Sequence, residues 1–339
     1  MVSRLGRGPT AREPVRLPLW VATGAFWFAV AAILAARSAG LAEVPLVTTV
    51  GVIFTSIVVE ALPFILLGAM VSAAIAAWVP DRTFARLARF PRALQVPAAA
   101  VAGVGFPVCE CGSVPVARRL MMRGIDPAAG IAFMLAAPIL NPIVLASTWV
   151  AYDGRDKALE MTAARAGLGL AIAILAGSLI GRRAGGSPLR PTRDLSASQH
   201  EHDASEGRPV AAFSRHLASD FFFMGKFLIL GAAASALLQA VLPQSFIAGV
   251  GGTPVLSALI MVGIAFALSL CSEADAFVAV SFTAFPLGSQ LAFLVAGPML
   301  DTKLAVLYGA TFRRDFIVKL VLVVVPVAVA GSMLFEVLT

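Results

Sequence analysis

Long apolar runs, separated by short polar segments, cover most of this chain from Leu17 to Leu338. Nine segments are uncharged or nearly so: residues 19–36, 46–79, 94–117, 125–151, 158–181, 217–250, 254–286, 288–312 and 316–338. About 20 apolar residues are needed to cross the hydrocarbon core of a bilayer, so most of these segments are long enough to be membrane helices. The pattern predicts an all-α integral membrane protein with eight or nine hydrophobic segments.

One long polar stretch, residues 182–215, interrupts this pattern. It is rich in Ser, Arg, Gly, Pro and acidic residues and has no apolar period, so we expect a disordered cytoplasmic linker. The chain then has four parts. These are a cytoplasmic N-terminus with the first membrane helix over 1–45, a first repeat unit over 46–181, the linker over 182–215, and a second repeat unit over 216–339.

Three blocks of sequence occur twice in the same order, and they define the repeat. Residues 63–73 match 226–236, Cys109 falls opposite Cys271, and residues 132–141 match 292–301. The offsets are 163, 162 and 160 residues. We interpret this as an internal repeat. The alternative is two unrelated halves that look alike because both are rich in Ala, Leu and Gly.

The placement of arginines indicates how the two units are oriented. If every segment crossed the membrane, Arg118, Arg119 and Arg123 would lie outside, although basic loops tend to stay in the cytoplasm. If segments 94–117 and 254–286 are broken re-entrant hairpins instead, every basic cluster lies inside and the two units are inverted. This predicts about seven full crossings plus two hairpins. The alternative is that segment 94–117 is a kinked helix that spans the membrane.

Composition agrees with a membrane protein and excludes other classes. Of the 339 residues, 59% are hydrophobic and 13% are charged, against about 45–50% and about 25% in soluble domains. The net charge of +7 comes from Arg residues between apolar spans, so it indicates membrane topology rather than nucleic-acid binding. The basic start of the chain lacks the features of a cleaved secretory signal, so we expect a retained first helix and a cytoplasmic N-terminus. The P-loop pattern of an ATPase is absent, and we expect no cofactor and no enzymatic activity.

The chain has three cysteines, and all lie in the two proposed breaks. Residues 105–115, G-F-P-V-C-E-C-G-S-V-P, hold Cys109 and Cys111, and residues 269–275, S-L-C-S-E-A-D, hold Cys271. A single membrane cysteine is usually a small packing residue. Three at matched repeat positions favour a function instead. Because thiolates select soft species such as Cu(I), Zn or trivalent metalloids, we expect the three sulfurs to bind a metalloid or similar substrate.

Acidic residues lie beside these thiols. Glu110, Glu273 and Asp275 would suit proton exchange when a substrate binds or leaves an apolar site, whereas capping of half-helix ends is the alternative role. Glu60 and Lys226 lie within one turn of matching positions on repeat-related helices. Charged groups inside membrane spans are costly, so this pair is expected to form a structural ion pair or to take part in transport.

A second pair of interruptions follows the thiol motifs. Asn141 and Asp301 occupy the same place after A-P-I-L and G-P-M-L, and Lys303 is the expected partner of Asp301. The prolines are expected to interrupt the helices and to free backbone carbonyls; they are Pro138, Pro142 and Pro298. We expect Asn141, Asp301 and these breaks to belong to the same substrate cavity.

With these motifs the sequence resembles the predicted-permease family that includes the bacterial trivalent organoarsenical efflux permeases. The similarity runs from about Val52 to the end. It includes C-E-C-G-S-V-P, L-A-A-P-I-L-N-P at 135–142, S-L-C-S-E-A-D-A-F and V-A-G-P-M-L-D-T-K at 295–303. The resemblance implies a multi-pass permease of the bacterial inner membrane. For the arsenical members it implies export of species such as methylarsenite by cysteine coordination, at positions matching Cys109 and Cys111. Many members with the same motifs have no known substrate.

The predicted function is therefore secondary export of a small thiophilic substrate, such as a trivalent arsenical, with that substrate and the lipid bilayer as partners. A membrane thiol-disulfide oxidoreductase is one alternative. It is less favoured because a C-x-C disulfide closes a strained ring, whereas C-x-x-C is the common redox spacing. A channel, a permease for another substrate, or a structural part of a larger complex is the other alternative.

Overall fold

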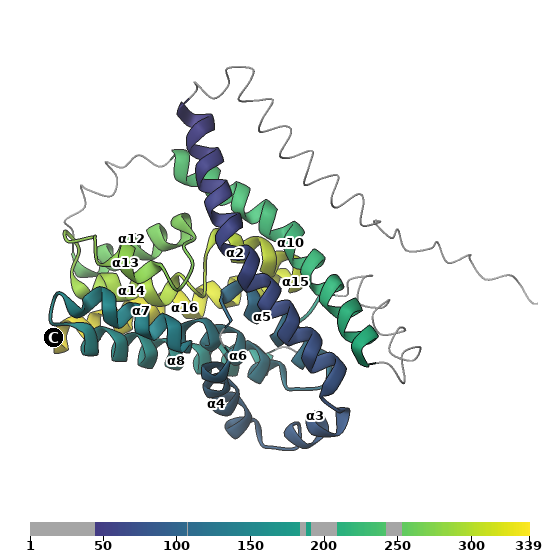
Figure 1. Ribbon diagram of the computed structural model, residues 1–339. Helices are drawn as coiled ribbons and strands as arrows, with labels where there is room; N and C mark the ends of the chain where they lie inside the picture. Colours follow the sequence, from purple (N-terminus) through teal and green to yellow (C-terminus); the bar gives the residue numbers. More distant parts are fainter. Residues whose placement is uncertain (1–44, 107, 184–187, 191–208, 242–252) are drawn as a thin grey trace, which may run out of the picture. The chain divides into compact units, whose positions relative to one another are not determined.

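The computed structural model describes residues 45–339 apart from 107, 184–187, 191–208 and 242–252 (Figure 1). The predicted helix at 19–36 and the cytoplasmic N-terminus lie outside these residues. The chain divides into two units at residue 50, and the site described below lies within the second, residues 50–339.

Within the described residues the regular elements are helices, as predicted. Their bounds are α2 Pro45–Trp78, α3 Asp81–Leu87, α4 Arg92–Ala102, the 3-10 turn η2 Gly103–Gly105, α5 Glu110–Met122, α6 Pro127–Leu140, α7 Pro142–Asp153, α8 Ala158–Arg183, α10 Pro209–Val241, α12 Pro254–Leu268, α13 Asp275–Ala279, α14 Leu287–Ala296, α15 Thr302–Thr311 and α16 Arg314–Leu338.

Five stretches of helix in the described chain are long and apolar enough to cross a membrane. They are Val47–Trp78, Pro127–Asp153, Ala158–Gly181, Val210–Val241 and Arg314–Leu338. Two shorter apolar helices, α12 and α14, accompany them. Large apolar side chains such as Val59 on α2 and Leu322 on α16 are exposed. Such an apolar exterior is stable in lipid, so the chain has the construction of a multi-pass membrane protein.

Several apolar segments are broken, and the sequence explains where. α6 stops at Leu140 because Asn141 caps α7, which starts at Pro142, a residue whose fixed φ suits the first helical position. The prediction that Pro138 interrupts the helix is wrong: α6 continues through it. The first thiol break is also shorter than expected, since α5 already begins at Glu110 and carries Pro115 inside it. Neighbouring helices shield an interior proline in a membrane protein, so it need not end a helix.

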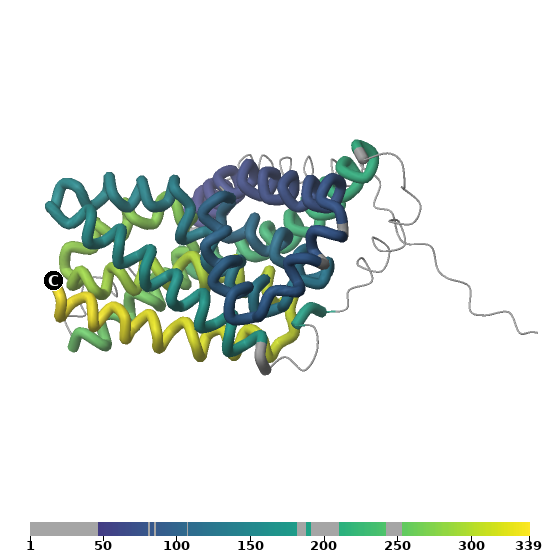
Figure 2. Tube along the Cα trace, turned by 90° about the horizontal axis from the view of Figure 1, so that it is seen from below, coloured from purple at the N-terminus to yellow at the C-terminus, as the bar shows by residue number. Residues whose placement is uncertain are grey.

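α6 forms the centre of the packing, and every residue from Ala128 to Leu140 is buried. It contacts α4, α5 and α8, while α14 in turn contacts α12 and α16. Small residues bring these helices close together: a Cβ added to Gly177 would stand 2.5 Å from the carbonyl oxygen of Ala128. Figure 2 shows α16, in yellow, running beside α8, in teal, which agrees with their direct contact.

The prediction for residues 182–215 is wrong at both ends. α8 continues to Arg183, and α10 already begins at Pro209. Between them, Leu189 forms an antiparallel bridge with Phe312, and the Arg190 N–H donates to the Thr311 carbonyl at 2.9 Å. The rest of the predicted linker lies outside the described residues.

Candidate functional site

The first break places two thiols at the start of a half-helix. After η2 the chain is extended at Phe106 and again at Cys109, which precedes the first turn of α5. The half-helix before it packs tightly on α6, since a Cβ added to Gly103 would lie 2.8 Å from the Cα of Ala137. Cys109 is 1% exposed and Cys111 is 4% exposed. Both thiols are therefore held in the protein interior.

The second break lies where the sequence predicted it. α12 ends at Leu268, Ser269 adopts a left-handed conformation with φ 47° and ψ 45°, and α13 begins at Asp275. The Ser269 hydroxyl accepts a hydrogen bond from the Thr302 N–H at 2.9 Å, which ties this break to the start of α15. Cys271, inside the break, is buried.

The two breaks meet through Ser272. Its hydroxyl lies 3.1 Å from Oε2 of Glu110 in the first break and 3.4 Å from Oε2 of Glu273 in the second, so it can donate to either carboxylate. The Cys271 thiol donates to the same Glu273 oxygen at 2.7 Å. Glu110 and Ser272 stand at equivalent positions of the proposed repeat. We name the group Glu110, Cys271, Ser272 and Glu273 the break cluster.

Lys303 supplies positive charge beside the break cluster. Its Nζ lies 3.4 Å from Oε1 of Glu110 and 3.7 Å from Oδ2 of Asp301. The predicted Lys303–Asp301 pair is thus present, and it extends to Glu110. All three side chains are at most 4% exposed, so the arrangement is a buried ion network.

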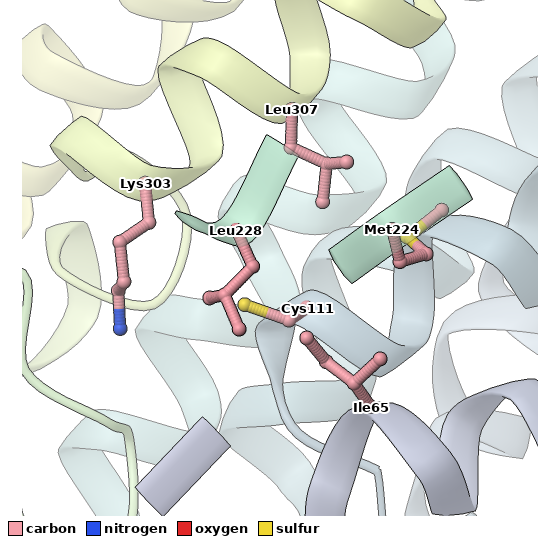
Figure 3. Close-up of a pocket in the computed structure, with 6 residues that line it drawn as sticks. All are labelled: Ile65, Cys111, Met224, Leu228, Lys303 and Leu307. Atoms are coloured by element: carbon pink, nitrogen blue, oxygen red, sulfur yellow. The ribbon is translucent and has the colours of Figure 1, made fainter. Parts of the chain in front are cut away.

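Cys109 and Cys111 lie together on the α5 side of the site. The Cys109 thiol lies close to that of Cys111 and within electrostatic range of Cys271. Cys111 lines a small cavity of about 10 Å³ with Ile65, Met224, Leu228, Lys303 and Leu307. Figure 3 shows its sulfur pointing toward Leu228, with Lys303 on one side and Ile65 and Met224 on the other.

The three sulfurs do not form one compact centre. Among the described residues, the group of three possible ligands whose atoms all lie within 4.8 Å of one another is Glu110, Cys271 and Glu273. The structure therefore places a thiol pair on α5 and a mixed thiol–carboxylate set at the second break.

Asp275 is held by a residue that sequence reasoning missed. Arg165 on α8 is 0% exposed, and it binds both Asp275 carboxylate oxygens, at 2.9 and 2.7 Å. It also donates to Thr148 Oγ1 at 2.7 Å and to the Ser272 carbonyl at 3.3 Å. The available signal was a basic residue within the apolar segment 158–181, which is costly in a membrane span unless it is paired.

The two remaining charged residues that the sequence singled out, Glu60 and Lys226, lie in different surroundings. Glu60 lies within electrostatic range of Lys303 and Glu110, so it belongs to the surroundings of the break cluster. The ammonium group of Lys226 stacks over the rings of Phe223 and Phe227, at 4.9 and 5.2 Å from their centres. The structure thus gives these two residues different neighbours on their repeat-related helices.

Asn141 and Asp301 have matching roles. Asn141 Oδ1 accepts from the Ile143 N–H at 3.0 Å, and Asp301 Oδ1 accepts from the Leu304 N–H at 2.6 Å, so each caps the second half of a broken segment. Asp301 also reaches Lys303, and Pro298 lies in the same gap between α14 and α15. Among the described residues, no side-chain hydrogen bond joins Asn141 to the break cluster.

A second polar group, also missed from sequence, ties three helices together. Arg119 on α5 donates to Asp220 Oδ2 on α10 at 2.8 Å and to Ser72 Oγ on α2 at 3.1 Å. The Ser72 hydroxyl donates to the same Asp220 oxygen at 2.7 Å, and Nδ1 of His216 lies 3.4 Å from Arg119. This group fixes the helix that carries Cys111 against α2 and α10.

Comparison with known proteins gives a consistent result. A family model described as "Predicted permease" matches residues 47–337. The "UPF0718 protein YcgR" of Bacillus subtilis is 41% identical over 289 residues, which cover 84% of this chain and 96% of the relative. A "Putative two-component membrane permease complex subunit" of Streptococcus mutans is 32% identical over 274 residues, or 79% of this chain and 89% of that protein. No solved structure matches.

Proposed function

The chain belongs to the predicted permease family, and from this premise we propose that it is a secondary permease that exports a small thiophilic substrate through the two helix breaks. One observation carries the proposal. All three cysteines of the chain are buried, Cys109 and Cys271 in the breaks and Cys111 in the first turn of α5, and the breaks meet at the hydrogen bond between Glu110 and Ser272. Sulfur donors at this position favour a soft substrate, and a trivalent organoarsenical is the first to test.

The formation of arsenic–sulfur bonds with this substrate requires no oxidant. A methylarsenite molecule carries two hydroxyl groups on arsenic, and each arsenic–sulfur bond that forms breaks one As–OH bond and one S–H bond and releases one water. The thiols of Cys109 and Cys111 lie close together, so they suit two such bonds. Methylarsenite has no third hydroxyl group to exchange, so Cys271 forms no bond to arsenic; its thiol lies at the second break, beside Glu273. Reversal of the same exchange by water on the far side would release the substrate.

The proposed architecture keeps the inverted repeat. The order half-helix, break, helix, broken segment and long helix occurs as α4, α5, α6, α7 and α8, and again as α12, α13, α14, α15 and α16. α4 has 11 residues, or about 16 Å of helix, which is too short to cross a bilayer. This supports two re-entrant hairpins that enter from opposite faces.

Reporter fusions test this topology. A reporter fused after Gly124, between α5 and α6, is expected in the cytoplasm together with the basic residues before it. A reporter after Thr339 is expected outside and serves as the control for expression and export. An external reporter after Gly124 would overturn the hairpin.

Transport tests the function. Cells that produce the protein are expected to accumulate less methylarsenite than cells without it, and Cys109→Ser and Cys111→Ser are each expected to abolish the difference. Ser281→Ala, at an exposed serine, is the matched control and should behave as wild type. If wild type leaves accumulation unchanged, the arsenical assignment fails. If the cysteine variants transport as well as wild type, the thiol mechanism fails.

A further inference from the structure

The buried charges at the break cluster do not balance. The Asp275 carboxylate is paired with Arg165 and can be set aside. Glu110 and Asp301 pair with the ammonium group of Lys303, and Glu273 lies beside Glu110; these three carboxylates and one ammonium group carry a formal charge of −2 when all four are ionised. Glu60 adds further negative charge within electrostatic range. Uncompensated charge is expensive away from water, so this region is suited to a ligand that brings two positive charges.

The donor atoms of the cluster have the arrangement of an open metal site. One ligand atom each from Glu110, Cys271 and Glu273 lies within 4.8 Å of the other two. We infer that these three side chains bind a divalent cation of borderline softness, with Zn²⁺ as the type and Cd²⁺ as its softer analogue. Binding of the cation does not depend on the proposed function. Its place on a transport route does rest on that function.

Two buried carboxylate oxygens of this region accept no hydrogen bond within the described structure. Oδ2 of Asp301, a residue that is 1% exposed, accepts no hydrogen bond within the described structure, although Lys303 lies 3.7 Å away. Oε1 of Glu273 is shielded from solvent and also has no hydrogen-bond partner. Buried polar atoms in native proteins are almost always satisfied. A cation bound by Glu110, Cys271 and Glu273 would supply the partner that Oε1 of Glu273 lacks.

The chemistry of the donors selects the class of cation. Zn²⁺ accepts carboxylate oxygen at about 2.0–2.2 Å and thiolate sulfur at about 2.3 Å in a tetrahedron, whose edges are then about 3.3–3.8 Å. The ligand atoms of Glu110, Cys271 and Glu273 now lie up to 4.8 Å apart. Side-chain rotations that shorten this distance by about 1 Å would bring them to the edge length of the tetrahedron. Mg²⁺ and Ca²⁺ need six or more oxygens. Three protein ligands leave a fourth position open, as in sites where the bound species exchanges.

Binding exchanges a proton for the metal. The Cys271 S–H bond, now directed at Glu273, breaks; the sulfur binds the cation as thiolate and the proton leaves to water. Lys303 remains on Oε1 of Glu110, while Oε2 faces Ser272 and the second break. The Cys109–Cys111 pair takes no part. A neutral trivalent arsenical would use that pair and would leave the charge imbalance unchanged.

The test is equilibrium binding of Cd²⁺ and Zn²⁺ to the purified full-length protein in lipid nanodiscs. Cd²⁺ binding is followed by its thiolate charge-transfer absorption, and Zn²⁺ by competition with a chromophoric chelator. Wild type is expected to bind one ion. Glu110→Gln and Glu273→Gln should each weaken binding more than about tenfold, and Cys271→Ser should remove the absorption band. Glu160→Gln, at an exposed carboxylate paired with Lys157, is the matched control and should change nothing.

Two results would overturn the inference. One is wild-type protein that binds neither ion. The other is a Cd²⁺ band that disappears in Cys109→Ser but persists in Cys271→Ser, which would place the soft site at the α5 pair. Protection of Cys109 from alkylation by methylarsenite is measured on the same Glu110→Gln and Glu273→Gln samples. If that protection persists while Cd²⁺ binding is lost, the cation site and the proposed arsenical site are separate. If wild-type protein binds Cd²⁺ but methylarsenite does not protect its Cys109 from alkylation, the proposed function fails and the cation site stands.

Discussion

The buried guanidinium of Arg165 controls the second break at the level of single residues. It neutralises Asp275 and holds the Ser272 carbonyl, so it positions the hydroxyl that joins Glu110 to Glu273. A fully buried ion pair of this kind makes a protein little more stable than well-packed apolar residues at the same positions would. Loss of one partner is costly, because it leaves the other charge buried and unpaired.

We therefore expect Arg165→Met to lower the stability of the detergent-solubilised protein by about 3–5 kcal/mol, because Asp275 stays buried without a partner. The double variant Arg165→Met, Asp275→Leu should recover most of this loss. The measurement is the thermal unfolding midpoint. Lys157→Met, at an exposed pair, is the control and should cost less than about 1 kcal/mol. A double variant no more stable than Arg165→Met would contradict the pairing.

Sequence reasoning found the thiols and the Asp301–Lys303 pair because each depends on local motifs. It did not find Arg165, whose partner lies 110 residues away on another helix. It also expected one centre of three sulfurs. Spacing along the chain does not show which side of a turn each thiol faces, so the association of Cys271 with two carboxylates became visible only in three dimensions.

At the scale of elements, close helix crossings position the first break. A Cβ added to Gly68 on α2 would stand 2.5 Å from the Cα of Gly112, the residue that follows Cys111. The three nearest atoms all belong to the backbone of Gly112, so rotation of a side chain cannot relieve the clash. The absence of side chains at this crossing lets α2 support α5 and the thiol pair.

Gly68→Ala is therefore expected to force α2 away from α5 and to destabilise the protein by about 1–3 kcal/mol, with loss of transport. Gly51→Ala is a matched control on the same helix, since a Cβ there meets nothing within 4 Å. It should be neutral or stabilise the helix by up to about 1 kcal/mol. The thermal unfolding midpoints of the two variants are compared. Equal midpoints would contradict the close contact between Gly68 and Gly112.

The positions of the broken elements followed largely from glycine and proline, but the details did not. Ser269 and Asn141 end helices where the motifs suggested, whereas Pro138 and Pro115 lie inside helices. A proline removes one donor and tilts the helix. Whether the helix then stops depends on the neighbours that satisfy the freed carbonyl, and these neighbours come from other parts of the chain.

At the scale of the whole molecule, the apolar pattern predicted the all-helical membrane protein, and the family comparison agrees with a permease. Hydropathy does not distinguish a spanning segment from a hairpin. The recurrence of half-helix, break and broken segment after about 160 residues is the observation that supports the proposed internal repeat. In the proposed arrangement the two breaks would approach from opposite faces, and the hydrogen bond between Glu110 and Ser272 is the contact expected where they meet.

Alkylation of the three cysteines in native membranes tests the central claim most directly. The rate at each thiol is followed by mass spectrometry, with and without trivalent methylarsenite. Binding at the breaks predicts that Cys109 and Cys111 become protected together when the arsenical is present, and that a competing dithiol restores their reactivity. Alkylation rates that do not change when methylarsenite is added would contradict a thiol-based substrate site. Protection that results from a Cys109–Cys111 disulfide would contradict it as well.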